Sequence, residues 1–306
     1  MKHPSTEEIQ ALPQTAAALA QLDAWIASRS TPESLLWFRQ QCQQISTAKQ
    51  ERDVYRAMGM AARKMGKADL NLDSDELAAA NQLRPGFDPS GWSLDIATRV
   101  AFLLVSYAGD EAQFANQLDR IADSAEINEL IALYCGFPLY PAAMAVEHRA
   151  REAIRSSMRP IFEAMAHRNP YPMEAFDEAA WNQMVVKCFF LDSPLWPLQG
   201  LEQRNNPALA VILLDLVHER WAAGRPISPE LWRCVTPYAA YAAYANIAGK
   251  SDVLRVLERG RDIERLAIAK SLPEHDNSLR VICEQQQLIT RAAHISWQQL
   301  LDETNH

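Results

Sequence analysis

Apolar residues recur at helical spacing along most of the chain. The clearest stripe lies within residues 51–65, where apolar side chains follow one another at intervals of three and four positions. Its members are Val54, Met58, Ala61 and Met65. This spacing predicts a helix that buries one face. No alternating run bounded by turn residues predicts a strand.

Helix starts and stops are marked by capping residues. Thr31, Asn206 and Ser228 each stand directly before a proline, which places a capping side chain ahead of the first helical position. Gly109 and Gly224 lie where helices are expected to end. Helices of about three to four turns with short connections predict an all-α fold of antiparallel hairpins, packed as a HEAT-like α-solenoid or as an irregular bundle. No tetratricopeptide or ankyrin consensus is visible.

The longest break in the helical pattern covers residues 84–92. Two prolines and two glycines in this run prevent a continuous helix. We expect a single all-helical domain over residues 1–306. Within it, the break is either a simple loop or the boundary between an N-terminal section (1–84) and a main section (93–306).

Composition limits the classes of partner. With 306 residues, of which 48% are hydrophobic, the chain can bury a substantial core. A net charge of -8 argues against nonspecific nucleic-acid binding, which requires a dominant positive surface. The longest apolar runs, 185–191 and 208–214, are far shorter than the roughly 20 residues of a membrane-spanning helix. Contact with a membrane surface is left open.

The N-terminal residues and the cysteines predict a cytoplasmic location. The chain begins MKHPSTEE, which contains no apolar core of a secretory signal. Five cysteines are scattered without a Cys-x-x-Cys pair, which is typical of reduced thiols.

Lys187 stands within the apolar run 185–191. Burying an unpaired ammonium costs several kcal/mol, so an interior Lys187 requires an anion or a lowered pKa. The alternative is a lysine at a helix edge that extends its ammonium to water. Asp215 interrupts a second apolar run, and His218 lies three residues further on the same helical face. We expect Lys187 and Asp215 to face each other or a common cavity. The Asp215 and His218 pair is either structural or able to orient an imidazole for proton transfer.

Two further segments contain candidate ligand contacts. The turn Asn169-Pro170-Tyr171-Pro172 is a stiff frame for Tyr171, either as a pocket wall or as an interhelical corner. Arg204 lies just before a predicted helix start, where an anion can bind, although plain capping explains the segment equally well.

A basic stripe lies beside the apolar face of residues 51–65. It consists of Arg52, Arg56, Arg63 and Lys67. We name Arg63, Lys64 and Lys67 as candidates for contact with phosphate or lipid headgroups, against the alternative of a solvated face.

Established catalytic and cofactor motifs are missing. His218-Glu219 begins like the zinc motif His-Glu-x-x-His, but Ala222 replaces the second histidine. There is no glycine-rich nucleotide loop and no Gly-x-Ser-x-Gly elbow. We therefore predict no metal and no cofactor.

Several segments resemble a known bacterial family. They are RKMGKADL at 63–70, LRPGFDPSGWS at 83–93, RNPYP at 168–172, FDEAAWNQMVVK at 176–187, PLWPLQGLEQR at 194–204, NPALA at 206–210 and HERWAAG at 218–224. In these segments the chain is similar to the EboA family, over about residues 30 to 235. The resemblance adds Trp181, Asn182 and Gln183 as ligand-binding candidates.

The resemblance implies a pathway rather than a reaction. EboA proteins are encoded beside a UbiA-like prenyltransferase and several enzyme-like proteins, in clusters linked to specialised metabolites such as the exported scytonemin precursor. Two hypotheses follow. The first is a non-catalytic scaffold or metabolite-binding protein that works with other ebo-pathway proteins. The second is an enzyme acting on a sugar- or cyclitol-derived intermediate with Lys187, Asp215 and His218 in an apolar pocket.

Overall fold

The computed structural model describes residues 15–141, 143–239, 249–273 and 277–302. Throughout these residues the regular structure is helical, and outside the helices a single isolated bridge joins Asp69 to Ser93. The all-α prediction is therefore confirmed, whereas the solenoid-like repetition stays a prediction. The chain forms two compact units, Met1–Ala180 and Trp181–His306.

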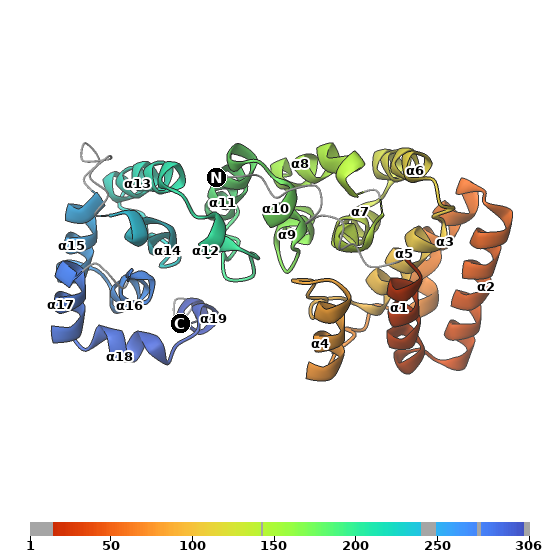
Figure 1. The fold of residues 1–306 in the computed structure, drawn as a ribbon, viewed down its shortest axis with the longest axis horizontal. Coiled ribbons are helices and arrows are strands. Elements are labelled where there is room, and N and C mark those ends of the chain that lie inside the picture. Colours follow the sequence, from red (N-terminus) through yellow and green to blue (C-terminus); the bar gives the residue numbers. More distant parts are fainter. Residues whose placement is uncertain (1–14, 142, 240–248, 274–276, 303–306) are drawn as a thin grey trace. The chain divides into compact units, whose positions relative to one another are not determined.

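The first unit is built around one central helix, α5 (Leu94–Val105) (Figure 1). The other helices of this unit are α1 (Thr15–Arg29), α2 (Pro32–Ala48), α3 (Glu51–Met65), α4 (Ser74–Leu83), α6 (Glu111–Ser124), α7 (Ile127–Cys135), α8 (Glu147–Arg155), α9 (Arg159–Ala166) and α10 (Tyr171–Ala175). Two 3-10 turns, η2 (Phe137–Leu139) and η3 (Ala143–Val146), separate α7 from α8. Helix α5 packs against α1, α2, α3 and α7.

Helix α5 carries a buried ion pair. Asp95 and Arg99 lie one turn apart and are 4% and 3% exposed, and their side chains form a salt bridge. The Ser93 hydroxyl donates to Asp95 at 2.6 Å, and Arg99 Nε donates to the Met58 carbonyl of α3 at 3.1 Å. These hydrogen bonds satisfy charges that would otherwise be costly to bury.

The sequence pattern of residues 51–65 is reproduced by α3. Its predicted apolar stripe is buried, with Val54, Met58, Ala61 and Met65 between 0% and 7% exposed. The basic side chains Arg52, Arg56, Arg63 and Lys67 are all exposed. Both results follow from helical periodicity.

The predicted break at 84–92 is a loop inside the first unit. Phe87 and Trp92 are buried and meet edge to face, with ring centroids 5.3 Å apart. Leu70 N–H donates to the Trp92 carbonyl at 2.9 Å. Arg84, which is 6% exposed, forms an ion pair with Glu174. The loop is thus held by its own apolar and polar contacts.

The second unit begins within α11 (Glu178–Phe190). Its other elements are α12 (Leu201–Arg204), α13 (Pro207–Ala222), α14 (Leu231–Val235), η4 (Thr236–Tyr238), α15 (Gly249–Arg259), α16 (Asp262–Ser271), α17 (Asn277–Gln285), α18 (Leu288–Ala293) and α19 (Trp297–Asp302). Helix α14 packs against α13 and α16, and α16 packs against α15 and α18 (Figure 1). Trp232 and Ile268 belong to this second core.

Two of the three predicted helix starts are confirmed. Thr31 accepts a hydrogen bond from Ser34 N–H, and Asn206 accepts one from Leu209 N–H at 2.9 Å. The start predicted at Ser228 is wrong, because α14 begins only at Leu231. Leu231 N–H bonds to the Ser228 carbonyl three residues earlier, so the segment forms a tight turn before the helix.

Glu230, in this turn, is only 1% exposed. Its carboxylate accepts a hydrogen bond from Leu195 N–H at 2.6 Å, and one of its oxygens lies 3.9 Å from the Arg233 guanidinium. Burial raises the pKa of Glu230 to about 7, against the smaller opposing effects of Leu195 and Arg233.

No disulfide is present in the described residues. Cys188, Cys234 and Cys283 are buried, and Cys42 and Cys135 are half-buried. Burial raises the pKa of Cys234 to about 12 and that of Cys283 to about 11.

Candidate functional site

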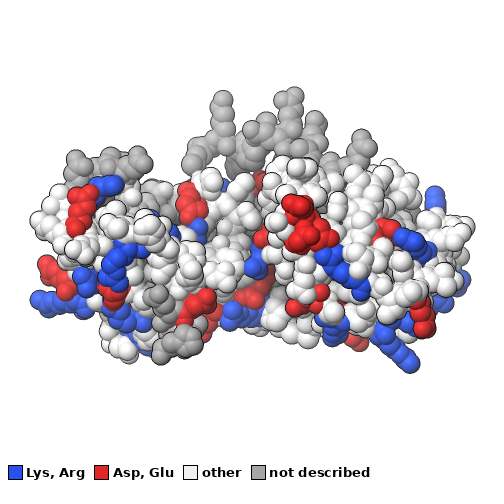
Figure 2. All heavy atoms as spheres, turned by 90° about the horizontal axis from the view of Figure 1, so that it is seen from below, with Lys and Arg blue, Asp and Glu red and all other residues white. Residues whose placement is uncertain are grey.

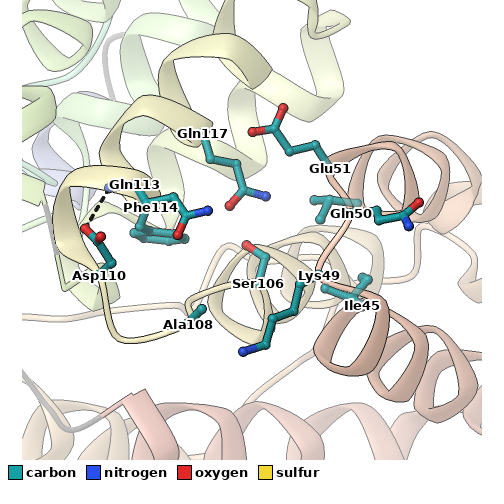
Figure 3. A pocket seen from close by; sticks show the side chains of 11 residues that line it. Ile45, Lys49, Gln50, Glu51, Ser106, Ala108, Asp110, Gln113, Phe114 and Gln117 are labelled. Carbon is teal, nitrogen blue, oxygen red and sulfur yellow. Dashed lines mark hydrogen bonds between the residues drawn. The ribbon is translucent and has the colours of Figure 1, made fainter.

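A cavity of about 260 Å³ opens in the first unit where α2 gives way to α3, opposite the start of α6 (Figure 3). Its apolar lining is made by Ile45, Val54, Ala108 and Phe114. Its polar lining is made by Lys49, Gln50, Glu51, Ser106, Asp110, Gln113 and Gln117. The cavity lies below the roughly 300 Å³ at which drug-sized pockets begin, so it suits a small molecule.

Local chain geometry explains why these residues meet. Helix α2 ends because Lys49 adopts a left-handed conformation, with φ of 49°, and its N–H bonds to the Ile45 carbonyl. Helix α6 begins at Asp110, whose carboxylate accepts a hydrogen bond from Gln113 N–H at 3.0 Å. Both helix ends therefore open toward the same space, and each brings a charged side chain.

Gln117 is the most deeply buried polar residue of the cavity lining. It is 8% exposed, and its amide makes no hydrogen bond within the described part of the chain. In Figure 3 the amides of Gln113 and Gln117, one helical turn apart on α6, both extend into the cavity. The amide is thus free to hydrogen-bond to water or to a ligand inside the cavity.

The aromatic side of the cavity is rigid. Phe114 is 2% exposed and meets Tyr107 and Tyr140 edge to face, with ring centroids 5.4 Å and 5.8 Å away. Such pairs fix the ring position. The Ser106 hydroxyl donates to the Leu103 carbonyl at 2.6 Å and keeps its lone pairs for another donor.

Glu51 is already committed to a neighbouring arginine. Arg120 of α6 bonds to both carboxylate oxygens of Glu51, one of them at 3.1 Å. In Figure 3 the Glu51 carboxylate points away from the Gln113 and Gln117 amides. Glu51 therefore borders the cavity without offering its charge to the interior.

The predicted residues of the second unit form a different cluster. The Arg204 guanidinium stacks over the fully buried Trp181 ring, 5.1 Å from its centroid. Asn182 and Asn206 exchange amide hydrogen bonds of 3.2 Å and 2.8 Å, which tie α11 to the start of α13. Gln183 is exposed. The structure thus brings together Trp181, Asn182 and Arg204.

Lys187, Asp215 and His218 are not joined to one another in the described residues. Lys187 is half-buried and forms no ion pair there, and Asp215 is exposed. The exposed His218 bonds through Nε2 to Asp252 of α15 at 2.7 Å, rather than to Asp215. A shared role for the three residues stays a prediction.

The turn at 169–172 is an interhelical corner. Asn169 accepts a hydrogen bond from Tyr171 N–H at 3.0 Å and donates to the Tyr134 carbonyl at 3.4 Å. The Tyr171 hydroxyl donates to the Ala143 carbonyl at 3.0 Å, and its ring meets Phe137 edge to face. These contacts explain the sequence of the turn by packing, and a ligand role stays a prediction.

Arg63, Lys64 and Lys67 are exposed and form no ion pair within the described residues. On the face drawn in Figure 2, basic and acidic side chains are interspersed over much of the surface. Contact of the three residues with an anion stays a prediction.

Neither a membrane-spanning helix nor a metal-binding cluster is found among the residues that the structure describes. None of their helices combines the length and apolar character needed to cross a membrane. No group of three or more His, Cys, Asp or Glu side chains in this part of the chain is arranged to hold a metal ion.

Comparison with known proteins gives the family. The model of the family described as "Metabolite traffic protein EboA" matches residues 18–236. The chain belongs to the EboA family. No curated protein and no solved structure matches it. The region shared with EboA proteins includes both the cavity and the Trp181 cluster.

Sequence reasoning missed the cavity, although one signal was present. Phe114, Leu118 and Ile121 form the buried stripe of α6, and Gln117 occupies a position on that stripe. A glutamine in such a position is unusual, because this residue type is mostly exposed. Much of the facing cavity wall comes from residues about 60 to 70 positions earlier, which helical periodicity alone does not reveal.

Proposed function

We propose that this EboA protein is a non-catalytic binding protein for a small polar metabolite of an ebo-type pathway, and that the cavity between α2, α3 and α6 is its binding site. The observation that carries this proposal is the largely buried Gln117 side chain, whose amide extends into the cavity and has no hydrogen-bonding partner in the described residues. This amide can donate to and accept from a polar ligand that takes the place of water in the cavity.

The family description supports handling of a metabolite rather than a particular reaction. A traffic protein must bind its cargo and release it unchanged, and a small, polar, partly open cavity suits that requirement. The assignment to an ebo-type pathway, with other ebo-encoded proteins as partners, rests on the resemblance to the EboA family.

The alternative is an enzyme acting on a sugar- or cyclitol-derived intermediate through Lys187, Asp215 and His218. One observation favours it: Asp252 is 7% exposed and holds the exposed His218 imidazole, an arrangement that can serve proton transfer. Against it, Asp215 and His218 are both exposed, whereas such chemistry needs an enclosed site.

The test is retention of a metabolite. Purified protein is incubated with a metabolite extract, passed through gel filtration and denatured, and the released small molecules are identified by mass spectrometry. We expect one polar compound to be retained unchanged by the wild type and lost from Gln117→Leu. Gln183→Leu, an exposed glutamine of the second unit, is the matched control and should retain it.

Other outcomes contradict the proposal in distinct ways. Loss of the compound from Gln183→Leu but not from Gln117→Leu would move the site to the Trp181 cluster. Consumption of a compound by the wild type and not by His218→Ala would establish the enzyme instead. If the wild type retains nothing, the cavity is not a metabolite site.

A further inference from the structure

The charges at the cavity rim limit the chemistry of its ligand. Lys49 and Asp110 are both exposed and both line the cavity, and neither takes part in an ion pair among the described residues. They are not paired with each other, so their charged atoms lie more than 4.0 Å apart. Glu51, the other charged lining residue, is bound by Arg120. One positive and one negative charge therefore remain without an ion-pair partner in the described residues, although one Asp110 oxygen also accepts from Gln113 N–H.

The two charged residues both lie at helix ends. Lys49 is the residue at which α2 ends, and the Asp110 carboxylate caps α6. In Figure 3 the Lys49 ammonium is directed toward Ala108, on the chain segment that leads to Asp110.

An anion, a cation or a neutral polyol would each fail to interact favourably with both Lys49 and Asp110. A small anion gains from Lys49 but is repelled by Asp110, and a small cation has the opposite problem. A neutral polyol bonds to the amides but uses neither charge. A zwitterion uses Lys49 for its carboxylate and Asp110 for its ammonium, while the glutamine amides can donate to and accept from its remaining polar groups.

We infer that the cavity binds a small zwitterion that carries one carboxylate and one ammonium group, the chemistry of a free amino acid. This inference rests on the proposed function, because it assigns the ligand class of the same site. The volume of about 260 Å³ and the apolar lining by Ile45, Val54 and Phe114 leave room for a short side chain.

The test compares probes that differ only in charge. Binding of the standard amino acids to the full-length protein at pH 7 is screened by ligand-observed NMR, and the best binder is taken to calorimetry. Its methyl ester, which removes the carboxylate charge, and its N-acetyl derivative, which removes the ammonium, are measured beside it. We expect each derivative to bind roughly tenfold or more weakly, because each loses one charge-assisted hydrogen bond.

Matched variants locate the two charges. Lys49→Asn removes the ammonium but tolerates the left-handed backbone at this position, and Asp110→Asn removes the carboxylate but preserves the helix cap. Each should weaken binding of the zwitterion roughly tenfold. Arg155→Asn, which removes an exposed positive charge of the same unit outside the cavity, should leave the affinity unchanged.

The failure of this inference is distinguishable from that of the proposed function. Erythritol is included as a neutral polyol and acetate as a simple anion. If either binds at Gln117 while no amino acid does, the cavity remains a metabolite site and the zwitterion is excluded. The same holds if an extract metabolite is retained and no amino acid binds. Equal binding of the zwitterion and both derivatives would also overturn the inference.

Discussion

Glu230 shows how burial changes the behaviour of one side chain. Its carboxyl group is almost fully enclosed, and burial raises its pKa from an ordinary value near 4.5 to about 7. Between these values the folded protein holds a proton that the unfolded chain has released. Stability from this group is therefore greatest below about pH 4.5, and it declines as the pH rises to about 7.

Replacing Glu230 by glutamine should remove this pH dependence. Glutamine keeps an oxygen acceptor for Leu195 N–H and cannot ionise. We expect the free energy of unfolding of the wild type to fall, relative to Glu230→Gln, by roughly 2 kcal/mol between pH 5 and pH 8. Urea titrations of both proteins at the two pH values measure this difference. An unchanged difference would mean that Glu230 titrates normally.

At the same scale, sequence reasoning located unusual residues better than it located their partners. The sequence marks Lys187 as a charge in an apolar run, and the structure shows it half-buried. His218 was expected to interact with Asp215, but it bonds to Asp252. That partner lies 34 residues away on another helix, and spacing within one helix contains no information about it.

Among the elements, α5 contains a buried salt bridge between Asp95 and Arg99. Arg99→Met should leave the Asp95 carboxylate buried without its partner, and we expect a loss of roughly 3–5 kcal/mol of unfolding free energy. Arg39→Met is the control, because Arg39 pairs with Asp23 on the surface at 2.8 Å and exposed pairs contribute little to stability. Urea unfolding followed by circular dichroism separates the two. Similar losses would contradict the distinction between the pairs.

Helix boundaries were predictable where a local cap determined them. The side-chain oxygens of Thr31 and Asn206 each accept a hydrogen bond from the N–H group three residues ahead, so the sequence signal and the structure coincide. Ser228 carries the same signal, yet a tight turn intervenes there and the buried Glu230 bonds outside its own segment. Tertiary contacts decided that boundary, and the local pattern could not include them.

The whole molecule is divided between two separate cores. Phe102, fully buried in α5, contacts Trp37 and Phe38 of the first unit, whereas Trp232 and Ile268 are buried in the second. The all-α class was predictable from the helical spacing of apolar residues, and a substantial core was predictable from the composition. The division near residue 180 was not, because it falls inside α11 and no proline or glycine marks it.

A cavity made in one core should affect that unit more than the other. Phe102→Ala is expected to cost about 3–5 kcal/mol in the first unit. Hydrogen exchange followed by mass spectrometry should then show faster exchange in α2, α3 and α5, with little change in α14 and α16. Equal acceleration in both units would mean that the chain opens as one body.

The buried thiols of Cys234 and Cys283 can report opening of the second unit. With pKa values raised to about 12 and about 11, these thiols hold almost no thiolate near neutral pH, and thiolate is the form that attacks an alkylating reagent. Iodoacetamide can therefore label them only when the surrounding helices separate and water reaches the sulfur. The rate at which these thiols are labelled in the wild-type protein therefore measures how often the second unit opens.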